Sequence, residues 1–194
     1  MLRVAVLISG GGSNLQSLID FARREEKAGY EITFVISDRP AGGLARAEQA
    51  GIPTHLLDRK KGMKALAKEI HDLLDGRVDY IVLAGFLSIL DSDFIGEWKN
   101  RIINIHPALL PQFGGKGMYG ENVHKAVLSS GAEQSGCTVH FVDSGIDTGK
   151  IIDQMSLNID KKWNAEQLQK EVLNLEHILL PRTLQSLCKK GSEG

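Results

Sequence analysis

Asn104 and His106 lie two residues apart at the end of an apolar run, RIINIH, which Pro107 follows directly. If this run is a strand, both side chains point to one face, because side chains along a strand alternate with a period of two. An amide can donate to a carbonyl oxygen that becomes an oxyanion, and an imidazole can carry a proton near neutral pH. Each residue alone would also fit a strand-end polar residue with a backbone partner. The pair predicts a site for chemistry at a carbonyl group.

A second group of polar residues follows later in the chain. Thr138 and His140 share one face of another strand-like run, and Asp143 and Asp147 flank a short turn. An acid on such a turn can orient His106 or a water molecule and accept a proton. Asp143 alone fits a turn-forming aspartate. A zinc site from two histidines and an aspartate matches no metal-ligand spacing, so no metal is expected.

A glycine-rich segment, SGGGSN at 9–14, separates a strand-like run from a helical pattern. In such a place the first amides of a helix can bind a phosphate. No Gly-Lys-Ser/Thr follows, and Leu15 occupies the third glycine position of the dinucleotide fingerprint. Two alternatives remain open: a tight turn in which Ser13 caps the helix, and a nucleotide cofactor whose ribose is held by Asp38.

The elements that must position these residues follow from the spacing of apolar residues. Strand-like runs lie at 3–8, 31–37, 54–58, 79–86, 101–106, 137–143 and 150–159. Helices are predicted from Ser13 or Asn14 onward and at about 43–50, 63–75, 92–99, 121–130 and 164–189, with Pro181 kinking or breaking the last. The alternation predicts an open, mostly parallel twisted sheet with helices on both faces, ending in an antiparallel strand pair. The Gly- and Pro-rich stretch 107–120 is expected to be a long functional loop.

Composition sets broad limits on function. The 194 residues fit a single domain over 1–194, and the net charge of −1 gives no bulk positive field for nucleic acid or membrane surfaces. Cys137 and Cys188 form no disulfide framework or metal motif. No run approaches the roughly 20 apolar residues of a membrane span. The N-terminus has no signal-peptide pattern, so a cytoplasmic protein is expected.

Four segments, in order, resemble the phosphoribosylglycinamide formyltransferases: ISGGGSNLQ at 8–16, LAGFLSIL at 83–90, NIHPALLP at 104–111 and GCTVHFVDSGIDTG at 136–149. The resemblance runs in register over almost the whole chain. It implies a Rossmann-like formyltransferase fold. It also implies transfer of the formyl group of 10-formyltetrahydrofolate to the amine of 5-phosphoribosylglycinamide, the third step of de novo purine biosynthesis. Folate would be a co-substrate, with no tightly bound cofactor.

The resemblance also implies roles for individual residues. Asn104, His106 and Asp147 match the catalytic residues, with a protonated His106 whose pKa is raised by Asp147. Phosphate- and ribose-binding positions are Gly11, Gly12, Ser13, Asn14 and Glu176. Folate-binding positions are Leu87, Ser88, Ile89, Leu90, Asn104, Asp143, Ser144, Gly145, Ile146 and Asp147. Further candidates are Lys61 or Lys64, for a basic residue near position 60, and Thr138 and His140.

The chain departs from the family pattern in three places, of which one is the basic residue near position 60, which is not cleanly matched. Ser88 stands where the family often has arginine, and 114–120 looks like a small insertion near the substrate. Three other interpretations use the same fold. Methionyl-tRNA formyltransferase carries an additional C-terminal domain and a basic surface, and formyltetrahydrofolate hydrolase carries an N-terminal regulatory domain. A non-catalytic nucleotide-binding module would leave the catalytic set unused. The sequence favours a transferase acting on small molecules. It leaves open the oligomeric state (a homodimer included), the folate polyglutamate preference and the isomer of the Leu110–Pro111 bond.

Overall fold

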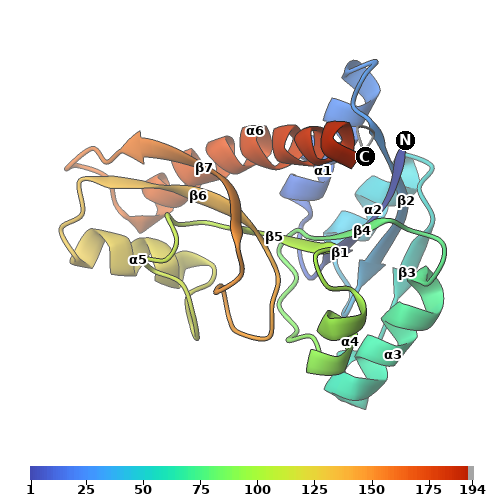
Figure 1. Cartoon of the computed structure of the whole chain (residues 1–194). Coiled ribbons are helices and arrows are strands. Elements are labelled where there is room, and N and C mark those ends of the chain that lie inside the picture. Colours follow the sequence, from blue (N-terminus) through green and yellow to red (C-terminus); the bar gives the residue numbers. More distant parts are fainter. Residues whose placement is uncertain (192–194) are drawn as a thin grey trace.

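Seven strands form one sheet in the computed structural model, which describes residues 1–191 (Figure 1). The strands are β1 (Leu2–Ile8), β2 (Tyr30–Ser37), β3 (Thr54–Leu56), β4 (Tyr80–Leu83), β5 (Ile102–His106), β6 (Gln134–Phe141) and β7 (Ile151–Asn158). They lie in the order β3-β2-β1-β4-β5-β6-β7. The pairs from β3 to β5 are parallel, and β6 pairs antiparallel with both β5 and β7. The predicted open, mostly parallel sheet with an antiparallel end is confirmed.

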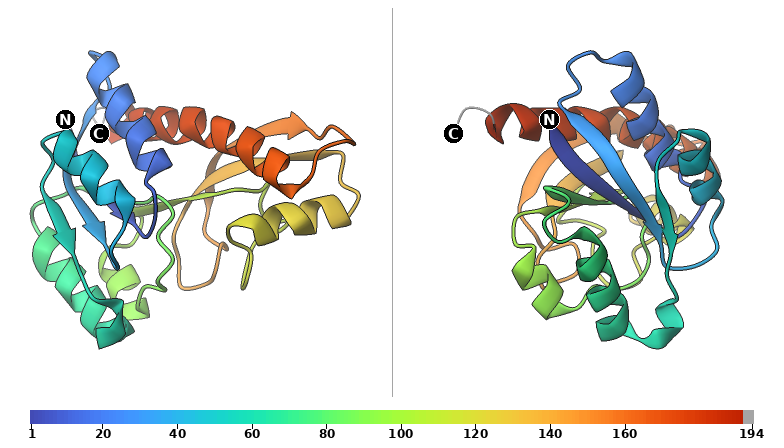
Figure 2. Two further views of the ribbon diagram at one scale, coloured as in Figure 1. Left: turned by 180° about the vertical axis from the view of Figure 1, so that it is seen from behind. Right: turned by 90° about the vertical axis from the view of Figure 1, so that its right-hand side faces the viewer.

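Helices cover both faces of this sheet, as predicted. They are α1 (Ser13–Arg24), α2 (Gly42–Gln49), the short 3-10 helix η1 (Arg59–Lys61), α3 (Met63–Leu74), α4 (Ser92–Glu97), α5 (Glu121–Ser129) and α6 (Ala165–Gly191). Figure 2 shows α1 and α6 on one side of the sheet and α3 and α4 on the other. Within residues 1–191, no helix is both long and apolar enough to cross a membrane.

The central strand β1 explains why the sheet needs helices on both sides. Val4, Val6 and Ile8 belong to the core beneath α1 and α6, whereas Ala5 and Leu7 belong to the core beneath α3 and α4. All five are fully buried. A strand that is apolar on both faces is stable only when both faces are covered, which is the arrangement of a parallel sheet.

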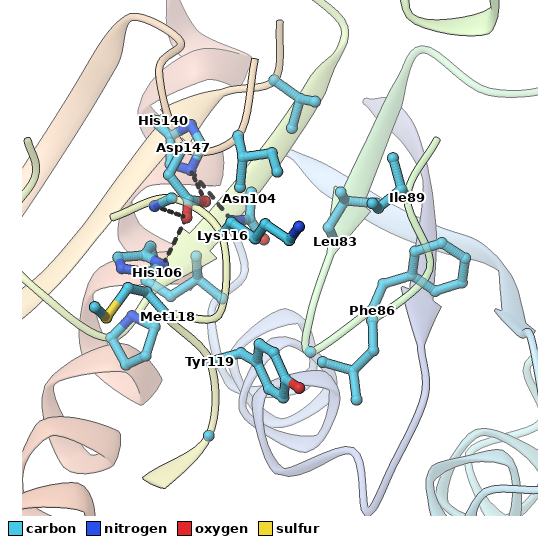
Figure 3. A pocket seen from close by; sticks show the side chains of 18 of the residues that line it. Leu83, Phe86, Ile89, Asn104, His106, Lys116, Met118, Tyr119, His140 and Asp147 are labelled. Atoms are coloured by element: carbon cyan, nitrogen blue, oxygen red, sulfur yellow. Dashed lines mark hydrogen bonds and ion pairs between the residues drawn. The ribbon is translucent and has the colours of Figure 1, made fainter. Parts of the chain in front are cut away.

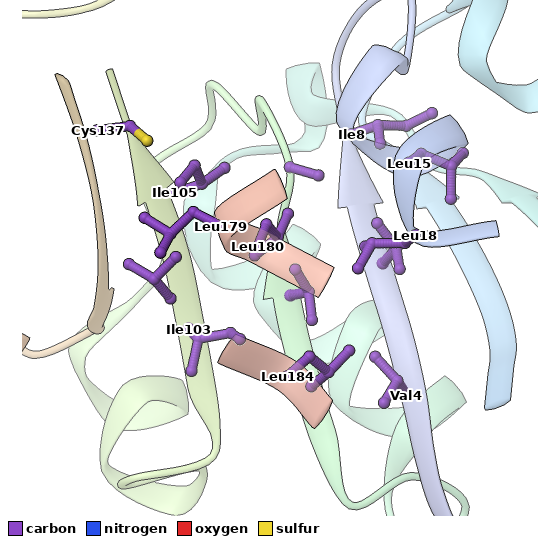
Figure 4. Close-up of a cluster of buried hydrophobic side chains, with 14 of the residues drawn as sticks. Val4, Ile8, Leu15, Leu18, Ile103, Ile105, Cys137, Leu179, Leu180 and Leu184 are labelled. Carbon is purple, nitrogen blue, oxygen red and sulfur yellow. The ribbon is translucent and has the colours of Figure 1, made fainter. Parts of the chain in front are cut away.

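Helix α6 runs without interruption through Pro181, so a break there is wrong, and the alternative of a kink at Pro181 stays a prediction. A proline inside a helix removes one backbone hydrogen bond and crowds the preceding turn, which costs about 3 kcal/mol. The neighbouring Leu179, Leu180 and Leu184 are nearly or fully buried and pack toward β1 and β5 (Figure 4). Each buried leucine contributes about 2 kcal/mol, so the packing of α6 outweighs the effect of the proline.

The carboxyl ends of the neighbouring strands β1, β4 and β5 lie at one edge of the sheet. The strands β2 and β3 follow β1 on one side and β4 and β5 follow it on the other, so the strand order reverses between β1 and β4. Such a switch point is where open α/β sheets bind ligands. Strand β4 ends at Leu83, earlier than predicted, because Gly85 adopts a φ of 74° and turns the chain away. Residues 107–120 contain no helix or strand, which confirms the predicted loop, and the Leu110–Pro111 bond within it is cis.

Candidate active site

A cavity of about 570 Å³ opens at the carboxyl ends of β4 and β5 (Figure 3). Its wall combines residues from segments that are far apart in the sequence. The predicted site residues that line it are Asn14, Leu87, Ser88, Ile89, Leu90, Asn104, His106, His140, Asp143, Ser144, Gly145, Ile146, Asp147 and Glu176. The structure therefore brings the amide, the imidazole, the acid and the two loop segments to one place.

The orientation of His106 is set by a backbone carbonyl of the long loop. Its Nε2 lies 2.8 Å from the carbonyl oxygen of Phe113, which can only accept, so Nε2 carries the hydrogen. The other ring nitrogen, Nδ1, faces Asp147 Oδ2 at 3.5 Å. In the neutral ring Nδ1 is thus the atom that can accept a proton, and the resulting charge would form beside a carboxylate.

Burial decides the protonation state of His106. The side chain is almost fully buried, and this burial lowers the pKa of His106 below its usual range. The charge of Asp147 and the Phe113 carbonyl act in the opposite direction but do not compensate. Asp147 therefore raises the pKa of His106, as expected, but desolvation of the charged ring is the larger effect, so the expectation of a protonated His106 does not fit the net lowering. At neutral pH the ring is a neutral base.

Asp147 is held by the loop that it faces. It has a φ of 58°, a left-handed conformation that aspartate adopts more readily than most residues. The backbone N–H of Gly115 donates to Asp147 Oδ2 at 3.0 Å. A Cβ at Gly114 would lie 3.2 Å from the Asp147 Cβ and 2.6 Å from Leu110 Cδ2, so a larger residue would displace the Leu110 side chain and crowd Asp147. Burial raises the pKa of Asp147, but nearby His140, His106 and the Gly115 amide outweigh it, and the net pKa is lowered.

His140 has a position that the sequence pattern did not reveal. Its Nδ1 lies 2.8 Å from the carbonyl oxygen of Phe141, so Nδ1 carries the hydrogen of the neutral ring. Its Nε2 then accepts from the Asn104 Nδ2 at 3.1 Å and lies 3.7 Å from Asp147 Oδ1. His140 therefore orients the Asn104 amide and leaves its second Nδ2 hydrogen for a ligand.

Thr138 does not line the cavity and supports the loop instead. Its hydroxyl donates to the Ala108 carbonyl at 2.7 Å and accepts from the Leu110 backbone N–H at 3.1 Å. It also accepts from Gln154 Nε2 at 2.8 Å. The side chain is fully buried. Thr138 thus ties strand β6 to the start of the 107–120 loop.

The glycine-rich segment ends in a helix start that has no side-chain cap. The N-cap of α1 is Gly12, with a φ of 72°, and no side chain of the described residues caps the first amides, so the alternative with Ser13 as the cap is wrong. A Cβ at Gly12 would lie 2.8 Å from Gly43 Cα, so only glycine fits. Arg46, which sequence reasoning missed, donates from Nε to the Gly11 carbonyl at 2.7 Å. Its guanidinium and Ser13 line a second cavity of about 530 Å³ beside this segment.

Asn14 and Glu176 connect the start of α1 with the middle of α6. Asn14 Nδ2 donates to Glu176 Oε2 at 2.6 Å, and Asn14 Oδ1 is buried with no hydrogen-bond partner within the described residues. Burial raises the pKa of Glu176 to about 7, although the bond from Asn14 lowers it. Because both residues line the large cavity, the unpaired amide oxygen can be satisfied by a ligand.

The buried carboxyl group of Glu176 predicts a pH dependence of stability. Between its ordinary pKa of 4.5 and its folded pKa of about 7, the folded state binds more protons than the unfolded state. The free energy of unfolding should therefore fall by roughly 3 kcal/mol as pH rises through this window. Urea unfolding of the Glu176→Gln variant should lack this decline. The exposed Glu166→Gln is the control and should retain it, and equal slopes for Glu176→Gln and wild type would contradict the prediction.

Segments 87–90 and 143–147, which the resemblance assigns to folate binding, form an apolar rim of the large cavity. Leu87, Ile89 and Ile146 are 53%, 67% and 46% exposed, which is unusual for large apolar side chains and suits a ligand that covers them. Asp143 accepts from the Gly145 backbone N–H at 3.0 Å and from the Thr148 hydroxyl at 2.7 Å. Its carboxylate therefore stabilises the turn, as predicted for a turn-forming aspartate.

Other candidate residues lie outside the large cavity. Lys61 donates to Glu69 Oε1 at 2.7 Å on the surface, and neither it nor Lys64 is among the lining residues. Asp38 is 1% exposed and already receives hydrogen bonds from protein side chains, so it is not available to a ribose. Cys137 is fully buried, and burial raises its pKa to about 12.

Several lining residues were missed because no local pattern marks them. His124 of α5 is 1% exposed and has an Nδ1 without a hydrogen-bond partner in the described part of the chain. Lys116, Met118 and Tyr119 come from segment 114–120, which is predicted to be an insertion, and they line the cavity (Figure 3). The lining position of these three depends on the path of the loop. Across residues 1–191, no group of three His, Cys, Asp or Glu is arranged to hold a metal ion.

Comparison with known proteins identifies the family. The model of the family described as formyl transferase matches residues 2–184. The trifunctional purine biosynthetic protein adenosine-3 of Drosophila melanogaster is 44% identical over 95% of this chain, which spans only 14% of that protein. The chloroplastic phosphoribosylglycinamide formyltransferase of Vigna unguiculata is 39% identical over 97% of this chain and 61% of its own length.

Solved structures show the same relationship at the level of the fold. The phosphoribosylglycinamide formyltransferase of Brucella melitensis is 40% identical, with a TM-score of 0.88, and covers 96% of this chain and 95% of its own. The glycinamide ribonucleotide transformylase 1 of Symbiobacterium toebii is 35% identical, with a TM-score of 0.91, and covers 98% and 89%. Because the family model matches residues 2–184, nearly the whole length, the chain belongs to the formyl transferase family.

Proposed function

We propose that this chain transfers the formyl group of 10-formyltetrahydrofolate to the amine of 5-phosphoribosylglycinamide, a step of purine biosynthesis. The observation that carries the proposal is the cavity in which Asn104, His106 and Asp147 meet Asn14 and Glu176. Membership of the formyl transferase family supports the reaction class. Relatives named phosphoribosylglycinamide formyltransferase support this pair of substrates.

The start of α1 suits the phosphate of the ribonucleotide. The first backbone amides of the helix, at Ser13 and Asn14, lack a side-chain cap and carry the positive end of the helix dipole. Arg46 adds a guanidinium beside the same segment. Glu176 and the unpaired oxygen of Asn14 would then bind the ribose hydroxyls, which can both donate and accept.

The opposite side of the cavity suits the folate. Segments 87–90 and 143–147 face it with exposed apolar side chains, and their backbone groups would hydrogen-bond the pterin ring. In this proposal the folate is a co-substrate that leaves as tetrahydrofolate, and no tightly bound cofactor takes part.

The geometry supports a direct transfer. The amine nitrogen attacks the formyl carbon, and the carbonyl electron pair moves to oxygen, where the free Nδ2 hydrogen of Asn104 stabilises it by roughly 3 kcal/mol. The attacking nitrogen, now positive, loses a proton to Nδ1 of neutral His106, and the imidazolium forms beside Asp147. The proton then passes to N10 of the folate as the carbon–N10 bond breaks. No covalent bond to the protein forms.

We also propose that the chain acts as one domain. All strands belong to one sheet, and α1 and α6, from opposite ends of the sequence, share one core. The prediction of a single domain over 1–194 includes residues 192–194, which lie outside the described residues. A homodimer stays a prediction.

An acceptor-dependence assay tests the proposed function. Tetrahydrofolate formation from 10-formyltetrahydrofolate is measured with and without 5-phosphoribosylglycinamide. We expect turnover only when the ribonucleotide is present, because the amine is the nucleophile. Turnover without it would identify a hydrolase, and turnover only with methionyl-tRNA would identify a tRNA-specific transferase. The absence of turnover with every acceptor would favour the non-catalytic nucleotide-binding module.

A further inference from the structure

A buried network joins the ends of β1 and β2 to the segment that begins the folate side of the cavity. Asp38, directly after β2, is 1% exposed. Arg39 donates to it from Nε at 2.9 Å and from Nη2 at 2.8 Å, and the Ser88 hydroxyl donates to Oδ2 at 2.5 Å. Burial raises the pKa of the Asp38 carboxyl, but Arg39, Ser88 and the nearby Ser9 outweigh burial and lower it. We call Ser9, Asp38, Arg39 and Ser88 the Asp38 network.

The charge of Asp38 determines the direction of the hydrogen bonds that its carboxylate makes in this network. An ionised carboxylate can only accept, so the hydroxyl hydrogen of Ser88 points toward it. The Ser9 oxygen accepts the backbone N–H of Leu87, at 2.8 Å. Asp38 thus holds the side chain of Ser88 directly, and Ser9 beside it holds the backbone of Leu87.

The anchored segment is part of the cavity, whereas Asp38 is not. Leu87 and Ser88 line the cavity, and Asp38 is absent from its lining. The backbone N–H of Ser9 donates to the Gly85 carbonyl at 3.1 Å, which adds a third connection to this segment. The side chains of Leu87, in this segment, and of Ile89, just after it, are exposed.

We propose that Asp38 is a positioning residue that holds segment 85–88 in the conformation that binds the formyl folate, without touching either substrate. This inference rests on the proposed function. In this proposal the Asp38 network positions the folate side of the cavity. The ribonucleotide side, at Asn14 and Glu176, is positioned by the contact between α1 and α6.

Two variants change the network without removing bulk from the core. Asp38→Asn keeps the shape but introduces donor hydrogens among groups that already donate, and it leaves Arg39 without a carboxylate. Ser88→Ala removes one bond at a half-buried position, and Ser88→Thr restores the hydroxyl. Asp79→Asn is the matched control, because Asp79 pairs with Arg3 at the opposite end of the sheet, with Arg3 Nη2 at 3.0 Å from Oδ1.

The measurements are the KM for 10-formyltetrahydrofolate, the KM for the ribonucleotide, and calorimetric binding of tetrahydrofolate alone. For Asp38→Asn and Ser88→Ala we expect folate KM and tetrahydrofolate Kd to rise roughly tenfold, as for loss of a hydrogen bond to a charged group. The ribonucleotide KM and kcat should change less than about threefold, a difference below 1 kcal/mol. Asp79→Asn should behave like wild type in folate binding, and Ser88→Thr, which restores the hydroxyl, should recover part of the affinity that Ser88→Ala loses.

Hydrogen exchange supplies a readout that does not depend on activity. Protection of the Leu87 amide should fall in Asp38→Asn and stay unchanged in Asp79→Asn, because the Ser9 acceptor is disturbed only in the first. Equal losses for both substrates, or unchanged folate KM with unchanged protection of Leu87, would overturn the positioning role. A wild-type protein that neither binds tetrahydrofolate nor transfers formyl would instead overturn the proposed function, and the folate assignment with it.

Discussion

Replacing His106 with alanine should lower kcat for formyl transfer by a factor of about 10² to 10⁴, the usual contribution of a positioned acid–base group. His106 is the residue that receives the proton of the attacking amine in the proposed mechanism. Its Nε2 is committed to the Phe113 carbonyl, so only Nδ1, which lies beside Asp147, can take up a proton. The steady-state rate of tetrahydrofolate formation, with both substrates saturating, is the measurement.

The control for His106→Ala separates chemistry from folding. His106 is 3% exposed, so its loss leaves a small void, and thermal unfolding must show that the variant is folded at the assay temperature. His71→Ala, which removes a histidine that contacts Glu97 far from the cavity lining, should keep near wild-type kcat. A folded His106→Ala variant with a rate within threefold of wild type would contradict the assignment.

Asp147→Asn should lower kcat by about 10² to 10³. The imidazolium of His106 forms with Nδ1 3.5 Å from Asp147 Oδ2, and the attraction of two unit charges at this distance is about 5 kcal/mol at an effective dielectric of 20. Asparagine tolerates the positive φ of this position and still accepts from the Gly115 amide, so the loop should keep its shape. Steady-state kcat against pH is the measurement.

The pH profile distinguishes lost charge from lost structure. Asp147 raises the pKa of His106, so its removal should move the ring titration to lower pH, away from neutrality. Asp153→Asn, on the exposed face of β7, should leave kcat and the profile unchanged. An Asp147→Asn variant with reduced kcat but an unshifted profile would show that the carboxylate holds the loop without acting on His106.

The sheet could be predicted from the sequence because its signals are local. The apolar runs of β1, β2 and β5 are buried on both faces, and a run of that kind has few alternatives to a central strand. The grouping of Asn104 with His106 followed from the same period of two. The continuity of α6 through Pro181 could not be predicted, because tertiary packing of leucines outweighs a local penalty.

The site was only partly predictable, since much of it depends on contacts between distant segments. The pairing of β5 with β6 places His140 opposite Asn104 and so sets the direction of the Asn104 amide. The spacing of residues in the sequence does not encode this pairing. The pKa of His106 depends on a balance between burial and a nearby charge, and only the folded structure sets the two magnitudes. Arg46 reaches the Gly11 carbonyl across 35 positions, with no motif to mark it.

The hydrogen bond between Asn14 and Glu176 joins residues 162 positions apart. Parallel strands β1, β2 and β4 can pair while the later part of the chain is still unstructured, but the ribonucleotide side of the cavity exists only after α6 docks on α1. Contacts of such long range form late, because the entropy of closing a long loop must be overcome first. During refolding, the proposed formyl-transfer activity should therefore return after most of the secondary structure. Recovery of that activity would mark the docking of α6 on α1.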